Sequence, residues 1–290
     1  MIAPLDAPTL PAEDFAYLSR LLHDRAAIVL EPGKEYLALS RLDALARESG
    51  CGSVAALVDM LRLQPLDSEL HERVIDALTT NETTFFRDIN PFESLQTTVL
   101  PELIERRART RNLAIWSAGC STGQEPYSIA MSIREHFPEL ATWNVTILGT
   151  DISPTVLERA RRGRYGQLEV NRGLPAHLLV RHFTRVGMEW EIEEPIRRMV
   201  RFQRRNLIHE WSGLPPFDIV FVRNVMIYFD VESKRRVLAR MHDQLATNGY
   251  LLLGASETTF NLSEQFDRQL DGRTAWYRPL RTDPFGGAGR

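Results

Sequence analysis

The stretch that decides the fold of this chain is Leu113–Pro126, which reads LAIWSAGCSTGQEP. It begins with a short apolar run, Leu113–Ala118, of the kind that forms a buried strand. Two glycines follow within a tight turn, where the absence of a side chain lets a ligand approach the backbone closely. Pro126 suits the first turn of a helix. The stretch therefore predicts a strand, a ligand-binding turn and a helix in succession.

The chain after residue 112 alternates short apolar runs with amphipathic helical patterns, which is typical of a parallel α/β sheet. The apolar runs lie at 113–118, 145–149, 199–203, 219–222 and 250–254. Residues 163–198 interrupt this alternation with two short alternating stretches around Gly187, and that pattern predicts an inserted β-hairpin. We therefore expect a Rossmann-like α/β domain over 112–280, with a mainly parallel sheet and a small inserted antiparallel β-subdomain.

The first 80 residues follow helical spacing only, with turn signals at Pro32-Gly33 and at Pro65. They predict an all-α N-terminal bundle of about four helices over 11–80. Residues 81–111 are expected to link the bundle to the α/β domain. The glycine-rich composition of 281–290 predicts a disordered tail.

Composition and charge argue against several classes of protein. The chain has 290 residues, 43% of them hydrophobic and 25% charged, which is ordinary for a globular protein with a sizeable core. Its net charge of −3 argues against a nucleic-acid-binding surface. Two cysteines make no disulfide framework, no apolar run approaches the about 18 residues of a membrane span, and Met1–Leu10 lacks a signal-peptide pattern. A cytoplasmic location without membrane insertion is expected.

A ligand-like residue follows each of four apolar runs. Gly119 follows the first run, Asp151 the second, Asn206 the third and Asn224 the fourth. Ligands of open parallel sheets bind at the carboxyl ends of the strands, where an acid can hold ribose hydroxyls and an amide can both donate and accept. Each residue alone also fits ordinary turn chemistry. Their occurrence at four strand ends in order predicts a nucleoside site.

The ligand expected at this site carries no phosphate. The turn after the first run has no phosphate-binding lysine and departs from the G-x-G-x-x-G spacing of dinucleotide sites, so NAD and ATP are disfavoured. S-adenosylmethionine has a nucleoside and an amino-acid part but no phosphate, and it needs no such cradle.

A polar motif, Asn81–Asp88 (NETTFFRD), lies between the helical and the α/β regions. Its two phenylalanines, Phe85-Phe86, are interpreted as core residues, as in a plain linker. Asn81, Thr83 and Arg87 are instead polar residues at a domain junction, where ligand sites often form.

Three motifs, Asn81–Arg87, Gly119–Ser128 and Arg223–Phe229, occur in the order found in one protein family. From about residue 12 to 280 the chain resembles the CheR family of chemotaxis protein-glutamate methyltransferases. The resemblance implies a class I methyltransferase domain behind an all-α domain. It also implies transfer of a methyl group from S-adenosylmethionine to glutamate side chains of chemoreceptors, forming glutamate methyl esters and S-adenosylhomocysteine.

The resemblance also implies roles for single residues. Arg87 and Tyr228 are expected near the transferred methyl group, as catalytic residues. The residues implied to bind the cofactor are Asn81, Thr83, Arg87, Ala118, Gly119, Glu125, Asp151, Asn206, Leu207, Asn224 and Val225. Gln124 stands where the family usually has a second acid. No metal ligands are expected, since no histidine pair has zinc spacing with the cysteines.

The partners implied by the resemblance are the cytoplasmic methylation helices of chemoreceptors, contacted by the N-terminal helices. In some members the inserted hairpins also bind a peptide from the receptor C-terminus by adding a strand. The second N-terminal helix is often strongly basic in the family. Here Lys34, Arg41 and Arg47 alternate with acids. The receptor, its glutamates and the oligomeric state stay open at this point.

The expected reaction explains the motifs. A glutamate carboxylate, with a reference pKa of about 4.3, is ionised at neutral pH and needs no general base. The work left to the protein is alignment and exclusion of water, with Arg87 steering the carboxylate and Tyr228 either positioning a reactant or filling the core. Methylation of another protein or a small molecule, and a non-catalytic cofactor-binding module, are the alternatives.

Overall fold

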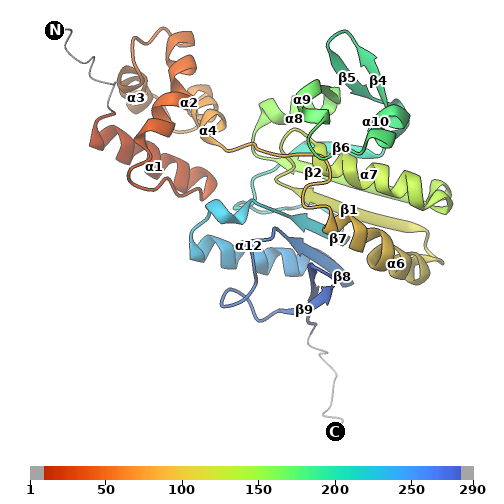
Figure 1. Cartoon of the computed structure of the whole chain (residues 1–290). Helices are drawn as coiled ribbons and strands as arrows, with labels where there is room; N and C mark the ends of the chain where they lie inside the picture. Colours follow the sequence, from red (N-terminus) through yellow and green to blue (C-terminus); the bar gives the residue numbers. More distant parts are fainter. Residues whose placement is uncertain (1–9, 282–290) are drawn as a thin grey trace. The chain divides into compact units, whose positions relative to one another are not determined.

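The computed structural model describes residues 10–281, and the chain divides into two compact units. A helical unit comprises the chain up to Thr80 together with Tyr228–Asp230, and an α/β unit comprises Asn81–Ile227 and the chain from Val231 (Figure 1). No helix in residues 10–281 is long and apolar enough to cross a membrane. The predicted tail lies, apart from Arg281, outside the described residues.

The helical unit confirms the predicted all-α region. Its helices are α1 (Ala12–Ala26), α2 (Glu35–Glu48), α3 (Val54–Arg62) and α4 (Glu69–Leu78). Ser53 accepts a hydrogen bond from the Ala56 N–H at 3.1 Å and so caps α3. The apolar faces meet in a core where Leu18, Leu42 and Val74 are fully buried. This burial fixes the four helices against one another.

The α/β unit is built on a seven-stranded sheet of order β6-β2-β1-β7-β8-β10-β9. Its strands are β1 (Asn112–Ala118), β2 (Asn144–Asp151), β6 (Val200–Arg204), β7 (Phe217–Val222), β8 (Leu245–Leu253), β9 (Phe266–Asp271) and β10 (Thr274–Pro279). The five strands from β6 to β8 are parallel, and β10 runs antiparallel to β8 and β9. The predicted mainly parallel, Rossmann-like sheet is confirmed.

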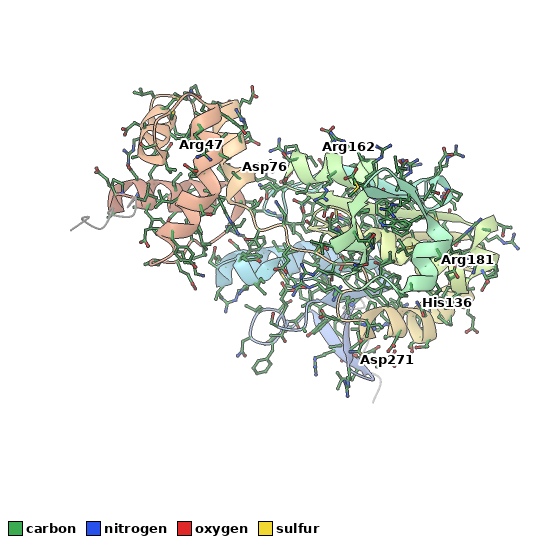
Figure 2. The ribbon with its side chains drawn as sticks, turned by 45° about the horizontal axis from the view of Figure 1, so that its top comes forward. Arg47, Asp76, His136, Arg162, Arg181 and Asp271 are labelled. Atoms are coloured by element: carbon green, nitrogen blue, oxygen red, sulfur yellow. The ribbon has the colours of Figure 1, made fainter. Side chains whose placement is uncertain are left out.

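The centre of the sheet is apolar on both faces, as parallel sheets covered by helices are. Every residue of β7 is buried. The main covering helices are α6 (Leu100–Arg107), α7 (Gln124–His136), α8 (Pro154–Arg162) and α12 (Val231–Gln244). Figure 2 shows charged side chains such as Arg162 and Arg181 at the outside, where each pairs with a glutamate.

The inserted β-subdomain follows α8 and forms a second, three-stranded sheet of order β3-β5-β4. Its strands, β3 (Arg164–Gly166), β4 (Phe183–Val186) and β5 (Glu189–Ile192), are all antiparallel. The predicted hairpin turn is present, with Gly187 at φ 63. The short helices are α9 (Gln167–Val170), α10 (Ala176–His182) and α11 (Glu194–Arg197). Buried Tyr165 donates its hydroxyl hydrogen to the Thr122 carbonyl at 2.7 Å, which ties the subdomain to the turn after β1.

Candidate cofactor and active site

The strand order brings the candidate residues of the α/β unit to one edge. Ala118, the last residue of β1, pairs with Thr150 of β2 on one side and with Val222 of β7 on the other. Asp151 of β2 pairs with Arg204 of β6. Because all four strands are parallel, the residues that follow them meet at the same carboxyl edge.

The turn after β1 lies against the turn after β7. Gly119 has φ 72, and a Cβ atom there would lie 2.4 Å from Cγ2 of Val225. Only glycine fits both the left-handed conformation and this close approach. The N–H groups of Gly119 and Cys120 donate to the Thr150 carbonyl at 2.8 and 2.9 Å. The two predicted cofactor residues, Gly119 and Val225, are therefore neighbours.

Asp151 organises the same turn. Its side chain is buried, and its two oxygens accept hydrogen bonds from the N–H groups of Ser121 (2.8 Å) and Ser153 (3.0 Å). A carboxylate can accept about four hydrogen bonds, which suits a residue that is expected to hold ribose hydroxyls. The Ser121 hydroxyl donates to the Asn81 carbonyl at 2.7 Å. This bond brings the segment that begins at Asn81 and leads to α5 (Asn90–Ser94) to the carboxyl edge of the sheet.

The predicted residues Asn81 and Thr83 line a hollow of about 720 Å³ together with Thr122 and Gln124. This hollow lies between the turn after β1, α8 and the β-subdomain. Thr83 therefore lies on the same side of the turn as Asn81.

Asn206 and Leu207 follow β6. The Asn206 side-chain oxygen accepts from the Ile208 N–H at 3.2 Å, and its carbonyl accepts from the Trp211 indole N–H at 3.3 Å. Leu207 is buried. These contacts shape the loop after β6 into a compact wall beside the end of β2, where Arg205 N–H donates to the Asp151 carbonyl at 2.9 Å.

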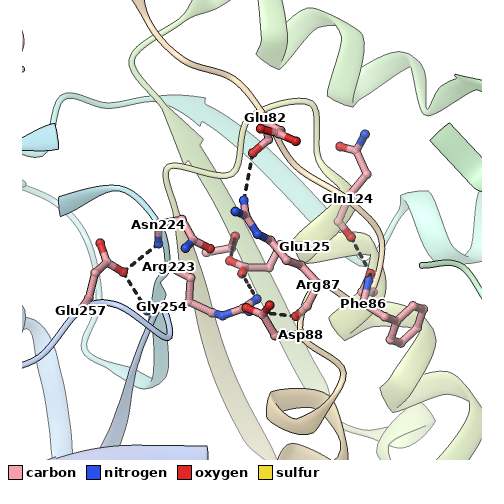
Figure 3. A network of polar contacts seen from close by, with 12 residues as sticks. Glu82, Phe86, Arg87, Asp88, Gln124, Glu125, Arg223, Asn224, Gly254 and Glu257 are labelled. Carbon is pink, nitrogen blue, oxygen red and sulfur yellow. Dashed lines mark hydrogen bonds and ion pairs between the residues drawn. The ribbon is translucent and has the colours of Figure 1, made fainter. Parts of the chain in front are cut away.

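A buried arginine ties two predicted site residues together (Figure 3). Glu125 accepts from the Ser117 hydroxyl at 2.8 Å through one oxygen and from Arg223 at 2.9 Å through the other. The Arg223 guanidinium also donates to the Asp88 carboxylate at 2.7 Å and to the Arg87 carbonyl at 2.8 Å. Sequence analysis named the motif that begins at Arg223 but gave this residue no role.

Arg87 lies in a turn with an unusual backbone. Its neighbours Phe86, Asp88 and Ile89 have φ values of 47, 69 and 35, in the left-handed region that residues with side chains rarely adopt. The half-buried Arg87 side chain donates to the Glu82 carbonyl at 3.2 Å. Such outliers persist only where the surroundings determine them, and they cluster at functional sites.

The turn after β7 is held by a residue that sequence analysis missed. One Glu257 oxygen accepts from the N–H groups of Asn224 and Gly254, both at 2.7 Å, and the other accepts from Val225 at 3.1 Å and Ile227 at 3.2 Å. Burial raises the pKa of Glu257, although the hydrogen bonds from the backbone lower it. The available signal was an acid three residues after Gly254, the glycine that follows β8.

Asn224 fits a ligand that donates a hydrogen bond. It has φ 58, and its side-chain oxygen is buried without a hydrogen-bond partner among residues 10–281. Buried polar atoms are almost always paired, so an orphaned acceptor at a strand end suits a bound group. With the glycine turn and the acids Glu125 and Asp151, this set of hydrogen-bond acceptors fits an adenosyl amino acid.

The second predicted catalytic residue, Tyr228, belongs to the helical unit. Its carbonyl accepts from the Val29 N–H at 2.8 Å, and the next residue, Phe229, forms a β-bridge with Ile28. Its placement near the transferred methyl group stays a prediction. In the described part of the chain no cluster of three or more His, Cys, Asp or Glu residues could hold a metal ion.

The mainly parallel sheet, with the candidate site at its carboxyl edge, has the fold of a class I methyltransferase domain. Residues 81–274 match the family model described as "CheR methyltransferase, SAM binding domain", and residues 13–79 match "CheR methyltransferase, all-alpha domain". The chain belongs to the CheR methyltransferase family, and its cofactor is S-adenosylmethionine. The predicted family, fold and cofactor are confirmed.

Relatives of known name cover most of the chain. Chemotaxis protein methyltransferase 1 of Pseudomonas aeruginosa is 43% identical over 87% of this chain and 93% of its own length. Chemotaxis protein methyltransferase Cher2 of Pseudomonas putida is 41% identical over the same shares. The chemotaxis protein methyltransferase of Vibrio parahaemolyticus is 40% identical over 91% of this chain and 95% of its own length.

Proposed function

We propose that this protein transfers a methyl group from S-adenosylmethionine to glutamate carboxylates of chemoreceptors, forming glutamate methyl esters in chemotaxis adaptation. The relatives named chemotaxis protein methyltransferase support the pathway, because the similarity extends through both domains. The observation that carries the chemistry is the turn of Arg87, which Arg223 joins to Glu125 at the cofactor edge.

The residues of the chain can hold the cofactor along its length. Asp151 would hold the ribose and Glu125 the amino-acid end of the cofactor. The turn at Asn224–Val225 would form the wall of the site between them. Bound S-adenosylmethionine supplies an electrophilic methyl group on its sulfonium. The buried floor beneath these residues excludes water, which would compete with a carboxylate nucleophile.

Arg87 would align the acceptor. An ionised glutamate needs no base, so the useful group is a planar guanidinium that orients the carboxylate. Arg223 holds the Arg87 carbonyl, and the Arg87 guanidinium donates one hydrogen bond, to the Glu82 carbonyl. No carboxylate within residues 10–281 pairs with this guanidinium, which leaves its other N–H groups available. Tyr228 is proposed as a second positioning group.

The helical unit is the proposed contact for the receptor methylation helices, and the β-subdomain for a receptor peptide, in a cytoplasmic protein. The basic residues of α2 are engaged within the unit. Arg47 pairs with Asp43 at 2.9 Å, and Arg41 donates to the Leu78 carbonyl at 2.6 Å. Recognition through α2 would therefore depend less on net positive charge than a strongly basic helix would.

The test uses methyl-labelled S-adenosylmethionine and membranes that carry candidate chemoreceptors, with base-released methanol as the readout. We expect base-labile label with the wild type, a loss of about a hundredfold in turnover with Arg87→Ala, and little change in melting temperature. Arg198→Ala is the matched control, because within residues 10–281 that exposed arginine pairs with Glu194 alone. Tight cofactor binding without label would favour another substrate or a non-catalytic module, and equal loss of turnover and stability would remove Arg87 from catalysis.

A further inference from the structure

Side chains anchor the left-handed turn Phe86–Ile89 at three points. The Phe86 N–H donates to the Ser128 hydroxyl at 3.0 Å, and that hydroxyl donates to the Gln124 carbonyl at 2.7 Å. The remaining anchors, at the Arg87 carbonyl and the Asp88 carboxylate, both come from Arg223 (Figure 3). Three backbone outliers in four residues need such over-determination to persist.

Arg223 is almost completely buried and contacts two carboxylates, Glu125 and Asp88; we call this set of contacts the Arg223 clamp. Its side chain is 2% exposed, whereas the side chains of its two carboxylate partners, Glu125 and Asp88, are 13% and 43% exposed. A planar guanidinium can serve two anions at fixed angles, which a lysine ammonium cannot. The clamp therefore joins α7, which carries Glu125, to the turn that carries Arg87.

The same strand offers a structural ion pair for comparison. At the amino end of β7, Asp218 accepts from Arg107 Nε at 2.8 Å and from the Ala114 N–H at 2.9 Å. That pair ties α6 to the sheet at the amino ends of the parallel strands, remote from the candidate site. Arg223 instead follows the carboxyl end of β7. Both arginines pair with a carboxylate, but Arg107 holds a helix to the sheet, whereas Arg223 holds the turn that carries Arg87.

We propose that Arg223 and Asp88 are positioning residues that couple occupancy of the cofactor site to the orientation of Arg87. A ligand that engages Glu125 restrains the guanidinium that also holds the Arg87 turn. The acceptor is then aligned only when the methyl donor is in place. This inference rests on the proposed roles of Arg87 and Glu125.

The first test needs no methyl acceptor. Hydrogen exchange of the amides of 86–89 is measured with and without S-adenosylhomocysteine, beside calorimetric titration of the same ligand. In the wild type we expect the ligand to slow exchange in this turn at least about fivefold. In Asp88→Asn we expect this slowing to be reduced at least about twofold but not abolished, because Arg223 still holds the Arg87 carbonyl, and the Kd to stay within about twofold, because the Glu125–Arg223 contact remains. Slowing of wild-type size in Asp88→Asn would overturn the coupling.

The second test is a double-mutant cycle in turnover. Asp88→Asn alone should lower kcat about tenfold with little change in KM for the cofactor, and in the Arg87→Ala background it should change the residual rate less than about twofold. Additive losses would show that Asp88 acts independently of Arg87 and would refute the proposal. A wild type that methylates no chemoreceptor contradicts the proposed function instead and leaves the exchange test intact.

Arg223→Lys and Arg107→Lys complete the comparison. We expect Arg223→Lys to weaken S-adenosylhomocysteine binding and to abolish the ligand-dependent slowing of exchange, since one ammonium cannot hold both carboxylates. Arg107→Lys should lower the melting temperature and leave both ligand readouts within about twofold. If the two variants behave alike, Arg223 is only a structural ion pair and the proposal fails.

Discussion

Replacing Glu257 by glutamine tests whether the turn after β7 is built for the cofactor. In the wild type both carboxylate oxygens accept backbone hydrogen bonds, two of them at 2.7 Å, from Asn224 and Gly254. A glutamine oxygen can keep this short pair. Its NH2 group then faces the N–H groups of Val225 and Ile227, which lose their acceptor.

The cost can be worked out from these contacts. The two short bonds lose the charge on their acceptor, but the burial cost of that charge, which raises the pKa of Glu257, is removed as well, so these two bonds change little in net energy. The half-buried N–H of Val225 loses its acceptor and faces an NH2 group, at about 2 kcal/mol, within the range for an unsatisfied donor. The N–H of exposed Ile227 can turn to water. The total is about 2 kcal/mol, divided between lost stability and a relaxed cofactor turn.

The assay pairs urea unfolding with calorimetric titration of S-adenosylhomocysteine, at mildly alkaline pH where the wild-type carboxylate is ionised. We expect Glu257→Gln to lower the free energy of unfolding by about 1 kcal/mol and to raise the Kd by about fivefold. The control is Glu102→Gln, which loses contacts to Tyr250 and Arg278 without touching a strand-end turn. Wild-type affinity in folded Glu257→Gln would refute the reasoning.

Gly119→Ala should abolish measurable S-adenosylhomocysteine binding, because the added Cβ would lie 2.4 Å from Val225. Normal affinity in calorimetry would mean that the turns after β1 and β7 separate readily. Asp151→Asn should weaken S-adenosylhomocysteine binding about tenfold, because the side chain that accepts from the Ser121 N–H loses its charge. An unchanged Kd would remove Asp151 from the cofactor site. The raised pKa of Glu257 means that the folded protein binds this proton more tightly than the unfolded chain. Stability contributed by Glu257 should therefore decrease as pH rises above 4.5, so the stability difference between wild type and Glu257→Gln, followed by urea unfolding, should narrow.

The parallel strands were predictable because their signals are local. The run 113–118 and the all-buried β7 are apolar stretches that a central strand requires on both faces. The β9–β10 hairpin was not predicted, because β9 is an edge strand with four consecutive exposed residues and shows no apolar run. The third strand of the subdomain, β3, has only three residues and gives no pattern at all.

Residues of the candidate site could be proposed from the sequence where a residue type has a known use at a strand end, as with Gly119 and Asp151, which the structure places at the same carboxyl edge. Arg223 and Glu257 were missed because their partners are distant in the chain. Arg223 meets Glu125 across 98 residues, and Glu257 meets Asn224 across 33. The spacing of neighbouring residues does not indicate contacts between distant segments. The contacts of Arg223 and Glu257 can therefore be identified only when the order of the strands in the sheet is known.

The close approach of Gly119 to Val225 also limits how this chain can diverge. A side chain at position 119 is excluded by the wall at position 225, and a bulkier residue at 225 is excluded by the turn at 119. Neither position can become larger, because position 119 is also held at φ 72, where any side chain is strained whatever the space beside it. Sequences that share this site should therefore keep glycine at 119 and a residue no larger than valine at 225, although 106 residues (225 − 119) separate the two positions.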